Sequence, residues 1–165
     1  MRLKLKPATS KQAAEIAVLR TAVAENLTAQ FGLGPWSRTG TEKGVFFDMR
    51  NSAVHVVTRR NKLIATLLLC TKKPWAIDRK HFSKCARPLY LCSMAVHPDW
   101  QQKGIGRRCI EEAKRLARKW PADAIFLDAY DAKAGAGEFY RKCGFREVGR
   151  VTYRNAPLIY FEMLL

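Results

Sequence analysis

The sequence has few acidic residues and no long apolar run. It holds 14 Asp+Glu against 30 Lys+Arg in 165 residues, a formal net charge of +16. Such a charge favours anionic partners such as nucleic acid, an acidic membrane face or a phosphorylated cofactor, but it says nothing about the fold. A basic surface with no charged partner accounts for the same net charge, so both interpretations stay open.

Cysteine motifs and targeting signals are also lacking. The five cysteines are an odd number without C-x-x-C spacing, which is typical of reduced thiols rather than of a disulfide framework. A zinc site built on His81 and Cys85 would lack a second ligand pair at suitable spacing, so we predict no metal. The opening MRLKLKPATSKQ has no continuous apolar segment of the kind that a signal peptide or a membrane span needs. We therefore expect a cytoplasmic protein without a membrane partner.

Length and periodicity predict one α/β (α+β) domain over residues 1–165, with a mixed central sheet of about six to seven strands flanked by helices. Strands are expected at 2–6, 53–59, 62–70, 89–96, 124–129, 145–153 and 157–164. Helices are expected from Ser10 through the apolar positions up to Leu27, at 41–51, at 105–120, and between Asp131 and Gly144. In this scheme Pro7 ends the first strand, Ser10 and Asp131 cap helices, and Gly144 ends the last one.

The order strand, helix, strand around residues 89–129 has a topological consequence. A strand, a crossover helix and a second strand in the same sheet form a right-handed unit with parallel strands. We therefore predict that strands 89–96 and 124–129 are parallel neighbours.

The turn HPDWQQKGIGRR, residues 97–108, joins the first of these strands to its helix. A helix start presents backbone N–H groups without internal partners, and phosphate fits that end. The residues after Gly106 are Arg107 and Arg108, so a Walker A loop is excluded. Cys109 stands where a dinucleotide fingerprint needs its third glycine, so that motif fails too. Taken alone, the segment is either an anion-binding turn or a plain strand-to-helix turn.

Two segments together resemble a known family. VHPDWQQKGIGRR places Gln101, Gly104 and Gly106 in Q-x-x-G-x-G spacing after a strand, which is similar to the acetyl-coenzyme A motif of the GNAT N-acetyltransferases. AGEFYRKCGF, from Ala136 to Phe145, resembles that family's later A-x-x-F-Y-x-K-x-G-F signature. The order of predicted elements also follows the family, least clearly over residues 1–40.

The resemblance implies an N-acetyltransferase that uses acetyl-CoA as cosubstrate, with two parallel strands splayed to admit the thioester. It implies that backbone N–H groups from Gln101 through Gly106 wrap the pyrophosphate, with Arg107 beside it, and that the strand 89–96 bonds the pantetheine arm. Where the family often has asparagine, this chain has Lys133. The cofactor-binding residues implied in this way are Met94, Ala95, Val96, Gln101, Gln102, Lys103, Gly104, Ile105, Gly106, Arg107, Lys133, Ala136, Phe139 and Tyr140.

Acetyl transfer from a thioester to an amine needs a neutral amine, donors for the oxyanion of a tetrahedral intermediate, and a proton for the leaving thiolate. The resemblance assigns the last role to Tyr140, whose phenol is protonated at neutral pH. The base is not assigned, because PLYLCSMAV lacks the glutamate that many relatives carry. Tyr90, Cys92 and Asp128 are the nearby candidates, Asp128 being the catalytic prediction, and ordered water is an alternative to any single base.

The acceptor is the least determined part. In the family it is selected by the first helices, the loop after them and the last hairpin, and here that loop holds Phe31, Pro35, Trp36 and Arg38. The basic balance modestly favours an acceptor with a carboxylate or phosphate. Two alternatives stay open, namely an acceptor carried on RNA and a non-catalytic acyl-CoA sensor, although no RNA-binding motif supports nucleic acid. We expect a monomer or a homodimer.

Overall fold

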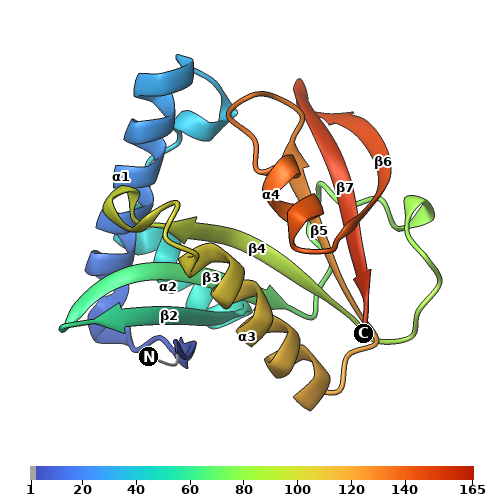
Figure 1. Cartoon of the computed structure of the whole chain (residues 1–165), viewed down its shortest axis with the longest axis horizontal. Coiled ribbons are helices and arrows are strands. Elements are labelled where there is room, and N and C mark those ends of the chain that lie inside the picture. Colours follow the sequence, from blue (N-terminus) through green and yellow to red (C-terminus); the bar gives the residue numbers. More distant parts are fainter. Residues whose placement is uncertain (1–2) are drawn as a thin grey trace.

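The computed structural model describes residues 3–165 and confirms the predicted mixed sheet flanked by helices (Figure 1). Within those residues the sheet has seven strands in the order β1-β2-β3-β4-β5-β7-β6. The strands are β1 (Lys6–Pro7), β2 (Ala53–Arg59), β3 (Lys62–Cys70), β4 (Pro88–Val96), β5 (Ala124–Tyr130), β6 (Arg146–Tyr153) and β7 (Ala156–Leu164). The α-helices are α1 (Ala13–Phe31), α2 (Glu42–Asn51), α3 (Ile105–Lys119) and α4 (Gly137–Lys142).

Helices cover both faces of the sheet, so the core has two halves. On α3, apolar residues at three- and four-residue steps form one buried stripe that packs with α4 against one face. On the other face, α1 and α2 pack over a second apolar cluster. Figure 1 shows α3 crossing in front of the sheet while α2 lies behind it. None of the helices in residues 3–165 is long and apolar enough to cross a membrane.

The strands expected at 53–59 and 62–70 pair as one hairpin and those expected at 145–153 and 157–164 as another, and the same dipeptide turns each of them. Arg60 and Asn61 between β2 and β3 have φ of 49° and 60°, and Arg154 and Asn155 between β6 and β7 have φ of 47° and 64°. Two consecutive left-handed residues make the turn whose twist matches antiparallel strands, and asparagine adopts that conformation more readily than most residues.

The parallel neighbours β4 and β5 are paired at one end and separated at the other. Their Cα partners are Pro88 with Ala124, Leu89 with Ile125, and Tyr90 with Phe126. Beyond Tyr90 these two strands no longer pair with each other in the described structure, whereas β4 follows β3 to Val96 and β5 follows β7 to Tyr130. Figure 1 shows the strands diverging toward the top of the molecule. This confirms the splayed arrangement that the resemblance implied.

A β-bulge bends β4 where it leaves β5. The β3–β4 register passes from Thr66 opposite Ala95 to Leu68 opposite Cys92, so β4 has one extra residue there. Ser93, in this segment, has φ of 47°. Bulges bend a strand and redirect its side chains, and they are frequent beside active sites.

Two predictions at the start of the chain are wrong in detail. The first strand covers only Lys6–Pro7, not residues 2–6, of which Arg2 lies outside the described residues. Pro7 is the last residue of this strand, as predicted, and an edge strand tolerates a residue without N–H. Ser10 is not the helix cap, since a 3-10 turn begins there and the Thr9 N–H donates to Gln12 Oε1 at 2.9 Å.

The start of the last helix also differs from the prediction. α4 begins at Gly137, so Asp131 does not cap it. The Asp131 N–H instead donates to the Pro157 carbonyl at 2.8 Å, and its carboxylate pairs with Arg150 at 3.1 Å. The pairing of β5 with β7 therefore continues through this residue, and a turn up to Ala136 precedes the helix. Gly144, with φ of 91°, follows the helix as predicted.

Candidate active site

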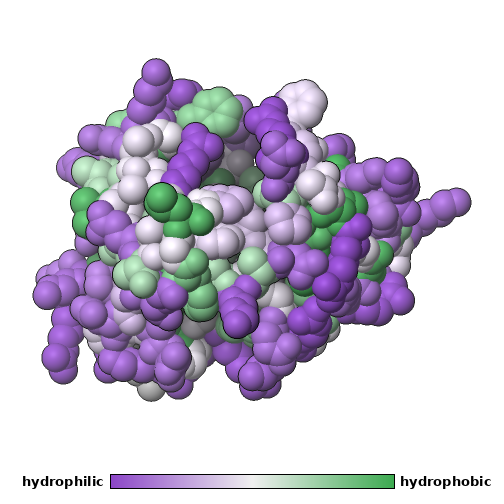
Figure 2. Space-filling model, turned by 90° about the horizontal axis from the view of Figure 1, so that it is seen from above, coloured by the Kyte–Doolittle hydropathy of each residue, from purple (hydrophilic) through white to green (hydrophobic). Residues whose placement is uncertain are grey.

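A cleft of about 520 Å³ lies between the separated ends of β4 and β5. Its walls come from α1, the loop after α1, residues 91–95 of β4, residues 128–130 of β5 and the turn at 134–136. Seen from above, the molecule is largely hydrophilic, and the surface is hollowed with apolar groups inside the hollow (Figure 2). The divergence of two strands thus creates a site that neither strand has alone.

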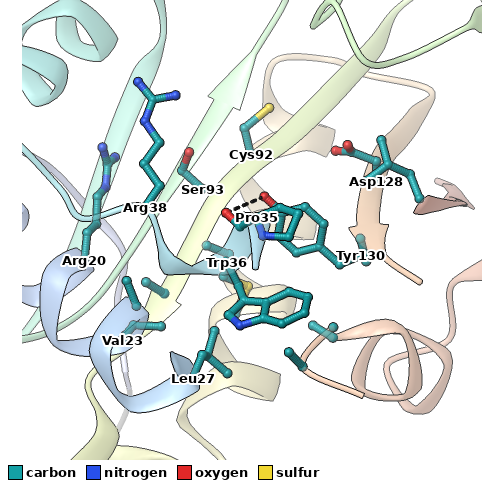
Figure 3. Close-up of a pocket in the computed structure, with 18 of the residues that line it drawn as sticks. Arg20, Val23, Leu27, Pro35, Trp36, Arg38, Cys92, Ser93, Asp128 and Tyr130 are labelled. Atoms are coloured by element: carbon teal, nitrogen blue, oxygen red, sulfur yellow. Dashed lines mark hydrogen bonds between the residues drawn. The ribbon is translucent and has the colours of Figure 1, made fainter. Parts of the chain in front are cut away.

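Asp128 lines the cleft from β5. Burial raises the pKa of its carboxyl above the ordinary value, and a hydrogen bond from its own backbone opposes this shift weakly. A carboxylate with a raised pKa is a better proton acceptor than an ordinary surface aspartate. Figure 3 shows its side chain at the β5 side of the cleft, facing Cys92 on β4.

Tyr140 reaches the same cleft from α4. Its side chain is buried against the rings of Phe139 and Phe145, at centroid distances of 5.2 and 5.6 Å. Burial raises the pKa of its phenol well above the usual value, and the Asp128 carboxylate raises it further. The phenol is therefore protonated throughout the neutral range, as a proton donor must be.

The other two base candidates do not suit that role. Tyr90 is 2% exposed, and its hydroxyl lies 3.3 Å from Arg79 Nη1, away from the cleft lining. Cys92 does line the cleft, but the neighbouring Cys70 thiol, whose Sγ lies 3.8 Å away, and burial raise the pKa of Cys92, so its thiol stays protonated. Asp128 is the candidate that combines access to the cleft with a suitable charge state.

The glycine turn before α3 has a strained backbone that its sequence accommodates. Gly104, directly before the helix, has φ of 75°, and Gln102 has φ of 56°. A Cβ added at Gly104 would meet no atom within 4 Å, so the backbone there is open on that side. Gln101 stabilises the turn, because its Nε2 donates to the Val96 carbonyl at 2.9 Å. The free N–H groups of the first helical turn follow immediately.

Position 106 favours glycine because neighbouring side chains leave little room for a Cβ. A Cβ there would lie 3.1 Å from the ring of Phe139 and 3.7 Å from Met94 Cε. Glycine at this position therefore lets α3, α4 and β4 meet closely. The segments 97–108 and 136–145 meet at this point, which links the glycine turn to the helix that carries Tyr140.

The other predicted cofactor residues are distributed around this junction. Met94, Ala95 and Ala136 line the cleft. Ile105 is buried, so only its backbone is available. Lys103 Nζ donates to the Asp99 carbonyl at 2.7 Å. Arg107, on the first turn of α3, has an exposed side chain, and so does Lys133, in the turn before α4.

The loop after α1 closes one end of the cleft. Tyr130 donates its hydroxyl to the Pro35 carbonyl at 3.3 Å, and its ring meets Trp36 edge-on with centroids 6.1 Å apart (Figure 3). Arg38 also lines the cleft, whereas Phe31 ends α1 and is not part of the lining. Three of the four loop residues expected near an acceptor are therefore at the site.

The α1 wall of the cleft was not predicted from the sequence. Val23 and Leu27, two apolar positions of the expected helix, line the cleft together with Arg20. A signal was available for Arg20, since it follows Ile16 and Ala17 at helical spacing and so interrupts a buried stripe with a charge. Tyr130 had no such signal, because its loop partner lies 95 positions away in the chain.

Comparison with known proteins agrees with this geometry. The model of the Acetyltransferase (GNAT) family matches residues 20–145. A curated relative, GCN5-related N-acetyltransferase 4, chloroplastic, from Arabidopsis thaliana, is 36% identical over 59 residues, which is 36% of this chain. The matched segment covers only 20% of that relative's length.

Solved structures share the whole fold at low identity. The ribosomal-protein-alanine N-acetyltransferase from Brucella melitensis superposes with a TM-score of 0.73 at 18% identity, covering 98% of this chain and 99% of its own. YncA from Salmonella typhimurium, solved with its cofactor acetyl-CoA, superposes with a TM-score of 0.69 at 16% identity, covering 100% of this chain and 95% of its own. These likenesses show the fold. Since the family model spans most of the sequence, from α1 through α4, this chain is an enzyme that belongs to the acetyltransferase (GNAT) family.

Proposed function

We propose that this chain, as one domain over residues 1–165, transfers an acetyl group from acetyl-CoA to a primary amine of a small molecule or protein. The observation that carries the proposal is the separation of β4 from β5. Asp128 and Tyr140 both line the cleft that results, which supports the roles of proton acceptor for Asp128 and proton donor for Tyr140. Such a pair is what amine acetylation needs.

The residues present fit acetyl-CoA. Gly104 leaves the backbone open at the start of α3, where unpaired N–H groups and the helix dipole favour phosphate. Beyond Tyr90, the edge of β4 that faces β5 is released from sheet pairing, so its N–H and C=O groups can bond an amide-containing arm. Bound there, acetyl-CoA would supply the activated acetyl group to the cleft.

Each protein group then has one task. Asp128 accepts the proton of the acceptor ammonium, directly or through water, so that the neutral amine attacks the acetyl carbonyl. Backbone N–H groups of β4 near Met94 stabilise the oxyanion of the tetrahedral intermediate. Tyr140 donates its proton to the departing thiolate, the second proton that the nitrogen loses as the amide forms returns to the phenol through water, and Asp128 releases its proton to solvent. Each charge that develops during the reaction is therefore stabilised or neutralised by a group that already lines the cleft.

The test is release of free coenzyme A thiol from acetyl-CoA across a broad panel of amines, together with the thermal shift that acetyl-CoA causes. We expect acetyl-CoA to raise the melting temperature, because a ligand that binds only the native state stabilises it, and we expect amine-dependent thiol release. Binding without turnover on any amine would favour the acyl-CoA sensor. Absence of a thermal shift at millimolar acetyl-CoA would overturn the proposal.

A further inference from the structure

Arg20, on the α1 wall of the cleft, has half of its guanidinium paired and half without a protein partner. Its Nη1 donates to Asp48 Oδ2 on α2 at 2.7 Å. Its Nε and Nη2 are buried and have no hydrogen-bond partner among the described residues. The side chain is 16% exposed and lines the cleft. A buried cation with unpaired donors is costly, so this arrangement needs a physical reason.

The two unpaired atoms form one edge of the guanidinium. The Nε and Nη2 hydrogens point the same way, and that edge binds both oxygens of a carboxylate in a fork. Asp48 occupies the opposite side of the group, so it holds the edge in a fixed orientation. The arginine is therefore oriented by one carboxylate and offers a geometry that a second carboxylate would complete.

A second cation and an apolar wall line the same cleft as Arg20. Arg38, from the loop after α1, lines the same cleft, and Figure 3 shows its side chain extending in the same direction as that of Arg20. Val23, Leu27 and the Trp36 ring form the neighbouring wall. One end of the cleft thus combines positive charge with apolar surface, while Asp128, the proton acceptor, lies toward β5.

We propose that the acceptor is a small amine that carries a carboxylate on an apolar carbon skeleton, with Arg20 as the residue that selects the carboxylate. This inference rests on the proposed function. The cleft volume, about 520 Å³, suits an acceptor of amino-acid size together with the acetyl end of the cofactor. Arg20 binds the carboxylate through Nε and Nη2, Arg38 adds positive charge, and the amine points to Asp128.

The loop after α1 supplies the entry path. The contacts of Pro35 and Trp36 with Tyr130 cover this end of the cleft, and they consist of one hydrogen bond and one edge-on ring contact. Movement of Pro35 and Trp36 away from Tyr130 breaks these two contacts and widens this end of the cleft for the acceptor, while hydrogen bonds of Ser37 to Thr28 at 2.7 Å and of Gly40 to Thr21 at 3.1 Å hold the loop to α1. Closing it excludes water, which strengthens the bond between carboxylate and guanidinium.

The experiment compares amino acids with their carboxamides as acceptors, for example leucine with leucinamide, by thiol release from acetyl-CoA. The amine of the carboxamide loses its proton more readily, so intrinsic reactivity alone would favour the carboxamide. We expect the opposite, with kcat/KM at least about tenfold higher for the carboxylate, since a charge-assisted fork is worth about that factor or more. Equal or reversed selectivity of the wild-type protein would overturn the inference without any variant.

The variant Arg20→Lys keeps a cation for Asp48 but removes the fork. We expect KM for the amino acid to rise about tenfold or more, a larger rise than for the carboxamide, so that the preference for the carboxylate falls, while the thermal shift by acetyl-CoA stays at the wild-type value. Arg118→Lys, an exposed position on α3, is the matched control and should change neither. Unchanged selectivity in a folded Arg20→Lys protein would make Arg20 purely structural. Loss of the acetyl-CoA shift in the wild type would instead refute the proposed function.

Discussion

Replacing Tyr140 with phenylalanine separates catalysis from packing at one atom. The ring is held by Phe139, Phe145 and Phe161, with centroid distances of 5.2, 5.6 and 6.0 Å, and phenylalanine keeps these contacts. The Tyr140 hydroxyl has no hydrogen-bond partner among residues 3–165. Its removal should therefore change the free energy of unfolding by no more than about 1 kcal/mol.

The effect on turnover should be far larger. A positioned general acid contributes roughly 100- to 10,000-fold to the rate, which corresponds to about 3–5 kcal/mol of activation free energy. We expect Tyr140→Phe to lower kcat by that range while acetyl-CoA still raises the melting temperature. Because burial and Asp128 raise the pKa of the phenol, the wild-type acid stays protonated, and therefore active, well into alkaline pH.

The assay is thiol release at saturating acetyl-CoA, followed from neutral to alkaline pH, beside a thermal melt of each protein. Tyr153→Phe is the matched control, because that tyrosine lies on β6, away from the cleft, under the Arg154 side chain. A Tyr140→Phe protein that turns over within about threefold of the wild type would refute the acid role, since a positioned general acid is worth far more than that.

Three further substitutions test the base Asp128, the turn before α4 and the glycine turn before α3. Asp128→Asn should lower kcat/KM roughly 100-fold or more by loss of the base. Burial raises the pKa of Asp128 in the folded protein, so its charged form is disfavoured there. The variant should therefore be more stable than the wild type at pH values above the ordinary Asp pKa, and this gain should disappear at lower pH. Gly135→Ala would place a Cβ 1.9 Å from the Tyr130 carbonyl oxygen, so a loss of about 1–3 kcal/mol is expected in denaturant unfolding, and wild-type stability would contradict that geometry. Gly104→Ala, at φ of 75°, should cost about 1 kcal/mol and weaken acetyl-CoA binding measured by calorimetry, and unchanged affinity would show that this turn does not hold the cofactor.

Local patterns determined much of the fold. The stripe on α3 depends on residues three and four apart, the first hairpin on an Arg-Asn turn between two β-branched runs, and the parallel pair on the order of strand, helix and strand. Each signal lies within a few turns of chain, so it is readable before the chain folds. The resemblance to the family rested on two short motifs of the same local kind, one around the glycine turn and one around Tyr140.

The site itself was decided by tertiary structure. Arg20, Trp36, Asp128 and Tyr130 come from three separate parts of the sequence, and they meet because a bulge at Ser93 bends β4 away from β5. No pattern within one element encodes such a meeting. Whether a charge is solvated or enclosed, and which donors it has left to offer, depends on the elements packed around it. The sequence by itself therefore determined the family and the order of the elements, and only the packed chain decided which side chains line the cleft.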